Sequence, residues 1–166
     1  MLHQDTELFF KDIYKKFSPK VHRLCLGYTG NAMLADDLLQ ETFIKVWQNL
    51  YKFKGNSQIS TWVYRIAVNT CLYHIRSQKN KVATSLDQIN SVIAEETDCK
   101  EQQVQLLYQC ISKLVVSDRL IITLLLEEVS YNEIAVITEI SEGNLRVKIH
   151  RIKQQLSKLY TEYERV

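Results

Sequence analysis

Apolar residues recur at helical spacing through the first part of this 166-residue chain. They follow one another at intervals of three or four residues over 5–17, 19–28 and 32–51, which is the period of an amphipathic helix. Ser18 and Pro19 separate the first two stretches, because Ser favours the N-cap of a helix and Pro its first position. We therefore predict three helices over these ranges.

A fourth helix is predicted after a loop over Lys52 to Ser60. From Ser57 to Lys81 the chain has four Lys or Arg and no Asp or Glu. At about 100° per residue, one side of this helix carries the apolar set Tyr64, Val68, Cys71, Leu72 and Ile75. The opposite side carries the polar and aromatic set Trp62, Arg65, Asn69, Tyr73 and Arg76. Guanidinium groups bind phosphate, amides pair with base edges and aromatic rings stack on unpaired bases. This face suits a nucleic acid, although an ordinary amphipathic helix with a solvated basic face has the same pattern.

The predicted helix over 32–51 has a second patterned face. Its members are spaced i, i+3, i+4 and i+7, and they are Asp37, Gln40, Glu41 and Ile44. A stripe of this kind is usually a solvated acidic face. Its mixture of acids, an amide and an apolar side chain also suits docking onto a basic protein surface.

Residues 82–104 differ from the rest of the chain, because they contain few apolar residues and many acids and amides. Polar segments of this kind connect domains that lie at a variable distance from each other. We therefore predict a flexible acidic linker between a first domain over 1–81 and a second domain over 105–166.

The second domain has the pattern of a helix-turn-helix. Ser117 and Asp118 are suited to cap one helix, and Ser130 followed by Glu133 is the signature of a capping box that opens the next. A short connection then leads to a long last helix over about 142–160, and this arrangement is typical of a helix-turn-helix.

The last predicted helix combines an apolar stripe with a basic surface. The stripe consists of Leu145, Ile149, Ile152, Leu156 and Leu159. The candidate contacts to DNA lie on the remaining surface, and they are Asn144, Arg146, Val147, Lys148, His150 and Arg151. No Asp or Glu occurs between 143 and 160, which suits a recognition helix in the major groove. A surface helix of a bundle and a dimerisation helix remain alternatives.

Composition supports an all-α protein of two small domains, a four-helix domain and a helix-turn-helix domain. The chain is 46% hydrophobic with only 4 Gly and 1 Pro, and its formal net charge is +2. No apolar run approaches the roughly 18 residues that span a bilayer, and the N-terminus lacks the pattern of a signal peptide. We expect a cytoplasmic protein that is not inserted in a membrane. The 4 Cys lack metal-ligand spacing, and no catalytic motif is present. We therefore expect neither a metal, nor a cofactor, nor an enzyme.

Three segments resemble bacterial extracytoplasmic-function (ECF) sigma factors. FKGNSQISTWVYRIAVNTCLYHIR, from Phe53 onward, closely resembles the promoter-melting segment of that family. DLLQETFIKVW resembles the segment that docks on the clamp helices of RNA polymerase. SYNEIAVITEISEGNLRVKIHRIKQQL resembles the domain that binds the minus-thirty-five promoter element.

This resemblance implies a role for each candidate residue. Core RNA polymerase would be contacted by Asp37, Gln40 and Glu41, with Ile44 beside them. A base flipped from the minus-ten element would enter a pocket bordered by Phe53, Asn56, Ser57, Gln58 and Ile59. Further contacts to that element would come from Trp62, Arg65, Asn69 and Arg76, of which Arg65 and Asn69 match positions on the upstream duplex. The minus-thirty-five element would be contacted by the six residues of the last helix.

Four positions depart from the family pattern. Asn144 and Val147 replace a usual Thr and Ser, which leaves the base preference at the minus-thirty-five element open. Glu139 stands where the family often has Gly, and His74 where it often has an acid.

The sequence therefore predicts an ECF-type sigma factor that binds core RNA polymerase and promoter DNA, melts the minus-ten region and is controlled by an anti-sigma factor. Two alternatives stay open. One is a helix-turn-helix repressor or activator that acts without polymerase, and the other is a sigma mimic that sequesters a regulator. The acidic face over 37–44 discriminates among them, because an operator-binding protein does not need it.

Overall fold

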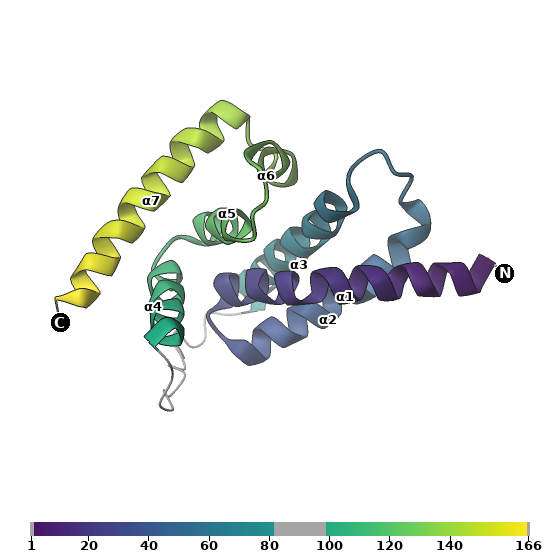
Figure 1. The fold of residues 1–166 in the computed structure, drawn as a ribbon, viewed down its shortest axis with the longest axis horizontal. Helices are drawn as coiled ribbons and strands as arrows, with labels where there is room; N and C mark the ends of the chain where they lie inside the picture. Colours follow the sequence, from purple (N-terminus) through teal and green to yellow (C-terminus); the bar gives the residue numbers. More distant parts are fainter. Residues whose placement is uncertain (1, 82–98, 166) are drawn as a thin grey trace.

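The computed structural model describes residues 2–81 and 99–165, and these residues form helices joined by short connections. The elements are α1 (Leu2–Thr29), α2 (Ala32–Asn49), the 3-10 turn η1 (Leu50–Lys52), α3 (Ile59–Lys81), α4 (Cys99–Ser112), α5 (Val116–Leu126), α6 (Tyr131–Thr138) and α7 (Glu142–Glu164). Figure 1 shows two groups, with α1–α3 in one and α4–α7 in the other. The predicted all-α fold with two helical domains is confirmed.

Helix α1 differs from the prediction, because it runs through Ser18 and Pro19 without a break. The first domain thus has three α-helices and η1 within the described residues, where the sequence predicted four helices. Proline inside a helix removes one hydrogen bond and costs about 3 kcal/mol. Here the turns on both sides of Pro19 bury apolar side chains in one core, among them Phe17 and Val21, which are 3% and 0% exposed. Burial of this kind contributes about 1.5–3 kcal/mol per large side chain, so packing offsets the cost of the proline.

The three helices of the first group enclose an apolar core. Helix α2 starts where the side chain of Asn31 accepts a hydrogen bond of 3.0 Å from the Leu34 backbone N–H. Its buried face includes Leu38 and leaves Leu39 half-buried. From α3 the core receives Val63, Tyr64, Ala67, Val68 and Cys71.

The second group contains the predicted helix-turn-helix. The capping box is confirmed, because the side chains of Ser130 and Glu133 bond each other's backbone N–H groups at the start of α6. The preceding helix begins earlier than predicted, with Val115 as its N-cap and no side-chain cap. Helix α6 ends on Glu139 at φ 58°, in the left-handed region. Glycine adopts that conformation at the lowest cost, which explains why a Gly often stands there in the family.

The predicted linker is only partly described. Helix α4 begins at Cys99, so residues 99–104 are helical. The remaining part, 82–98, lies outside the described residues.

The two groups pack against each other. Helix α1 lies against α5 and α4, and α3 lies against α6. Their buried apolar side chains form one continuous cluster that extends from Ile13 in α1 to Ile152 in α7. None of the helices in the described parts of the chain is long and apolar enough to cross a membrane.

Candidate polymerase and nucleic-acid interfaces

The acidic stripe on α2 forms one outer face of the first group. Asp37, Gln40 and Ile44 are exposed, and Glu41 is half-buried. Ile44 is 56% exposed, which is unusual for an isoleucine on a helix that also packs in a core. Glu41 is also held by Lys45, whose Nζ lies 2.6 Å from Glu41 Oε1. Asp37 therefore presents the less neutralised carboxylate of the two.

The basic-aromatic face of α3 is also present on the surface. Arg65, Asn69, Tyr73 and Arg76 are exposed, and the opposite face of the helix lies in the core. The fifth member, Trp62, is half-buried and packs on Phe53, with ring centroids 5.2 Å apart. Phe53 and Trp62 thus join the loop that precedes α3 to the first turn of that helix.

The loop before α3 presents its polar side chains to solvent. Gly55 has φ +74°, which permits a sharp turn that other residues adopt at a cost. Asn56, Ser57 and Gln58 are exposed, while Ile59 is half-buried at the start of the helix. The role of these residues in a pocket for a flipped base stays a prediction.

A cavity lies further along α3, in the groove between α2 and α3. Its volume is about 400 Å³, and its lining consists of Lys45, Asn49, Ile66, Asn69, Thr70, Leu72, Tyr73 and Arg76. Two lining residues, Asn69 and Arg76, were predicted as contacts to DNA. Lys45, Asn49 and Thr70 were not, because nothing in a single sequence pairs one helix face with another. The i, i+4 spacing of Lys45 and Asn49 was the one available signal, since it places both on one side of α2.

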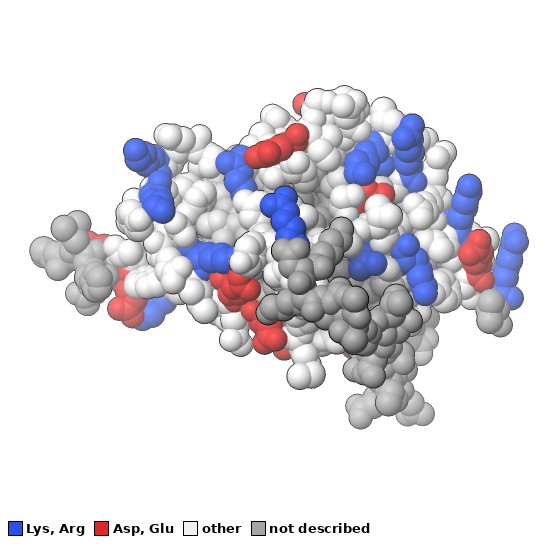
Figure 2. All heavy atoms as spheres, turned by 180° about the vertical axis from the view of Figure 1, so that it is seen from behind, with Lys and Arg blue, Asp and Glu red and all other residues white. Residues whose placement is uncertain are grey.

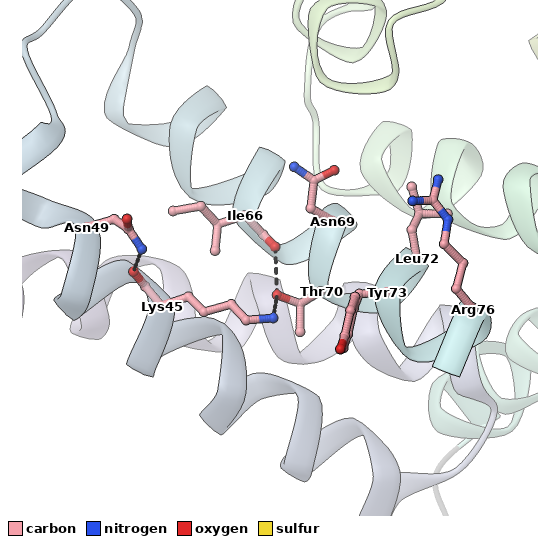
Figure 3. A pocket seen from close by; sticks show the side chains of 8 residues that line it. All are labelled: Lys45, Asn49, Ile66, Asn69, Thr70, Leu72, Tyr73 and Arg76. Carbon is pink, nitrogen blue, oxygen red and sulfur yellow. Dashed lines mark hydrogen bonds between the residues drawn. The ribbon is translucent and has the colours of Figure 1, made fainter. Parts of the chain in front are cut away.

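Lys45 spans this groove, as Figure 3 shows. Its Nζ lies 3.3 Å from Thr70 Oγ1 and 5.5 Å from the centre of the Tyr73 ring. The same ammonium pairs with Glu41, so the acidic face and the cavity share one cation. The groove therefore offers a positive charge, amides and an aromatic ring to a ligand from solvent.

His74 occupies the position where the family often has an acid. It is half-buried, and its Nδ1 shares a hydrogen bond of 3.3 Å with the hydroxyl of Tyr28. Its other ring nitrogen lies 3.3 Å from the amide of Gln78. The contact with Tyr28 directs the His74 side chain toward α1. The residue that departs from the family pattern therefore lies beside the basic-aromatic face and not on it.

On α7, the six predicted residues divide into two kinds. Arg146 pairs with Glu142 at 2.6 Å and lies over the Tyr131 ring at 5.1 Å. Lys148 pairs with Asp118 of α5 at 2.6 Å, and the Asp118 side chain is only 15% exposed. Asn144, Val147, His150 and Arg151 are exposed without such a pair among the described residues. Figure 2 shows Lys and Arg side chains over the end of the molecule that carries α7 and also toward the opposite end.

The start of α6 holds a carboxylate with a shifted pKa. Hydrogen bonds from Ser130 lower the pKa of Glu133 below its ordinary value, partial burial opposes this, and the hydroxyl of Thr61 adds to the lowering. Thr61 belongs to α3 in the other group, so Glu133 serves both the helix cap and the contact between the two groups.

Together these features define an all-α protein with a helix-turn-helix, a second basic face and a separate acidic face. Two family comparisons match most of the chain. Sigma-70 region 2 matches residues 13–81, and Sigma-70 region 4 matches residues 104–156.

Individual relatives agree with these matches. The ECF RNA polymerase sigma factor SigM of Bacillus subtilis is 31% identical over 153 residues, which cover 90% of this chain and 93% of SigM. SigW of the same organism is 32% identical over 163 residues, with 90% and 87% covered. Among solved structures, the sigma factor RpoE of Bartonella quintana, crystallised with the anti-sigma factor NepR, superposes with a TM-score of 0.75. It shares 20% identity, with 92% of this chain and 96% of RpoE covered.

The chain belongs to the ECF family of RNA polymerase sigma factors. It binds core RNA polymerase and directs transcription initiation from specific promoters, including the melting of the minus-ten region. The alternative of a helix-turn-helix regulator that acts without polymerase is not favoured.

Proposed function

We propose that the groove between α2 and α3 receives an unpaired base of the minus-ten element. The observation that carries this assignment is the cavity of about 400 Å³, which opens beside the basic-aromatic face of α3. Small-molecule sites have volumes of about 300–1,000 Å³, so the groove is large enough for a single base. Its lining supplies the chemistry that flipped bases require, namely edge contacts and a stacking surface.

The residues of the groove would make different contacts with the base and its phosphate. Asn69 carries an exposed amide that can pair with a base edge, and Tyr73, 64% exposed, offers a ring for stacking. The amide of Asn49 is already bonded to the Lys45 carbonyl and to Lys52 Nζ. Arg76 would neutralise a phosphate of the open strand. The loop residues Phe53, Asn56, Ser57, Gln58 and Ile59 do not line this groove. We propose that they contact the minus-ten element separately, with Trp62 supporting the loop through Phe53.

The duplex part of the minus-ten element would lie along the first half of α3, where Arg65 is exposed. On α7, we assign direct contacts with the minus-thirty-five element to Asn144, Val147, His150 and Arg151. Arg146 and Lys148 would act differently, because their ion pairs with Glu142 and Asp118 hold them in place. They would contribute positive potential and position the helix rather than select bases.

We propose further that Asp37, Gln40, Glu41 and Ile44 dock on the clamp helices of core polymerase. An anti-sigma protein is proposed as a second partner. Support comes from two similar structures, RpoE with the anti-sigma factor NepR and CnrH with the cytosolic domain of CnrY. A role in transcription places the protein in the cytoplasm.

The experiment that tests the groove is a transcription assay with purified core polymerase, this protein and a promoter found from genomic fragments. Tyr73→Ala removes the stacking ring from an exposed position. Stacking is worth about 1–3 kcal/mol per base, so we expect about a fivefold to hundredfold loss of melted promoter, measured by permanganate reactivity of unpaired thymines. The matched control is Tyr163→Ala near the end of α7, which should leave melting unchanged. If Tyr73→Ala melts the promoter as well as the unchanged protein does, the proposal that the groove receives a base is wrong.

A further inference from the structure

We propose that Asp118 limits the affinity of the helix-turn-helix for DNA, because it holds Lys148 of α7 away from the phosphate backbone. Asp118 is then a positioning residue that sets the strength of binding and does not contact DNA itself. The restraint on Lys148 rests on the proposed minus-thirty-five role of α7. It concerns phosphate contacts, whereas that role concerns the selection of bases.

The restraint is an ion pair between α5 and α7. Lys148 Nζ lies 2.6 Å from Asp118 Oδ1, and the two side chains are 34% and 15% exposed. Salt screens a partly buried pair of this kind much less than it screens contacts between fully exposed charges. Lys148 therefore stays paired at salt concentrations that weaken contacts with DNA on the surface.

Asp118 is fixed by its place on α5. It belongs to the first turn of that helix, where the positive end of the helix dipole stabilises a carboxylate. The hydroxyl of Ser117 donates to the same oxygen, Asp118 Oδ1, at 3.3 Å. A fixed carboxylate draws the long and flexible side chain of Lys148 toward α5.

Lys148 lies beside the proposed DNA contacts of α7. Asn144 is one turn before it and Arg151 one turn after it, so the three residues share one side of the helix. Asn144 and Arg151 are exposed. A lysine released at this position would reach the phosphates that flank the bases contacted by its neighbours.

The other paired cation of α7 is restrained more weakly. Arg146 pairs with Glu142 at 2.6 Å, but these side chains are 61% and 47% exposed. Exposed pairs within one helix contribute little and are screened by salt. The Arg146 guanidinium also lies 5.1 Å from the centre of the Tyr131 ring, a contact that positions the group and leaves its charge in place. Arg146 can therefore exchange Glu142 for a phosphate, whereas Lys148 is kept by Asp118.

The pair of Lys148 and Asp118 thus lowers the number of phosphates that α7 neutralises. Each neutralised phosphate releases counterions, so log affinity falls with log salt by about 0.9 per contact. Phosphate contacts strengthen binding to all sequences about uniformly. Asp118 therefore keeps sequence-independent binding low, while Asn144 and Arg151 stay available to bases.

The test measures binding of the full chain to two fluorescent duplexes, a promoter fragment with the minus-thirty-five element and a scrambled duplex of equal length. Anisotropy titrations at salt concentrations from about 50 to 200 mM give the affinity and its salt slope. Asp118→Asn should bind both duplexes about threefold to tenfold more tightly at the lowest salt, with a slope steeper by about 0.9. An unchanged slope, a gain confined to the promoter fragment, or no detectable binding by Asp118→Asn would overturn the proposal.

Two further variants establish that the gain comes from Lys148. Adding Lys148→Gln to Asp118→Asn removes the released cation, so this double variant should return to the affinity and slope of the unchanged protein. The matched control is Glu162→Gln, which removes an exposed acid near the end of α7. Glu162 lies about 21 Å along the helix from Lys148, beyond the Debye length of about 10 Å at 0.1 M salt. Equal gains by Asp118→Asn and Glu162→Gln would mean that net charge alone sets the affinity.

A variant that keeps Asp118 makes the test decisive if circular dichroism shows that Asp118→Asn does not fold. Lys148→Gln by itself should have the salt slope of the unchanged protein, because a restrained lysine contributes no phosphate contact. A slope flatter by about 0.9 would show that Lys148 already contacts DNA, and the proposal would be wrong.

Failure of the proposed minus-thirty-five role would appear differently. The unchanged protein would then bind the promoter fragment and the scrambled duplex with equal affinity. The salt slopes on the scrambled duplex test the restraint on Lys148 separately, because no base recognition contributes to them.

Discussion

The two basic faces of this sigma factor lie on helices of equal length in different surroundings. Helix α3 is buried on one side by α1 and α2 and is contacted by α6 near its start, and a groove opens beside its exposed side. Helix α7 has a narrower buried stripe and a more exposed surface. A groove with amides and a ring suits single bases, whereas an exposed helix suits the major groove of duplex DNA. The comparison teaches that similar side chains serve different DNA structures because the neighbouring helices differ.

The largest expected effect comes from the face of α3. Arg65→Ala with Asn69→Ala removes two polar contacts, each worth about 1–3 kcal/mol of discrimination. We expect at least about a thirtyfold loss of initiation in a transcription assay, with polymerase binding unchanged in a pull-down. Gln78→Ala, an exposed amide on the same helix, is the control. An equal loss of polymerase binding would mean that these residues support the fold.

The next effect concerns the docking face and separates its two acids. Asp37→Lys should weaken binding to core polymerase by about tenfold, or about 1.4 kcal/mol, because the reversed charge meets like charges across the interface. Glu41→Lys should have a smaller effect, since Lys45 already neutralises Glu41. Surface plasmon resonance with immobilised polymerase measures both variants. Unchanged binding by Asp37→Lys would refute the assignment of this face.

A smaller effect is expected on α7. Arg151→Ala should weaken recognition of the minus-thirty-five element by about fivefold, the value of one contact of about 1 kcal/mol. The footprint of the polymerase complex on a promoter measures this loss. Lys158→Ala, exposed two turns further along the same helix, should have little effect. An unaltered footprint with Arg151→Ala would show that this residue does not face the major groove of the DNA.

The smallest effect is a pH dependence that involves both domains. Because the folded pKa of Glu133 is lowered, its carboxylate stabilises the fold above the pKa of the unfolded chain, and this stability is lost as pH falls through the folded pKa. Glu133→Gln should therefore lose about 1 kcal/mol at neutral pH, as for other helix caps. Its urea midpoint should fall less than that of the unchanged protein between pH 6 and pH 3. Parallel curves would mean that Glu133 contributes nothing as an ion.

Local sequence patterns predicted most helices and most exposed faces. The capping box of Ser130 and Glu133 lies at the start of α6 as predicted, because capping depends on residues only three positions apart. Local rules failed at Pro19, where packing on both sides kept α1 continuous. They also failed to show that Lys148 is paired, since its partner Asp118 lies on another helix.

The sequence by itself determined the all-α class, the two domains, the helix-turn-helix and the side chains that each helix exposes. Periodicity and capping depend on neighbouring residues, so a single chain displays them directly. Only the tertiary structure decided that Lys45 crosses to Thr70, that a groove opens between α2 and α3, and that Arg65 meets α6. These features depend on the distance between helix surfaces, which is set by packing across the core and by a close approach such as that of Gly27 and Thr123.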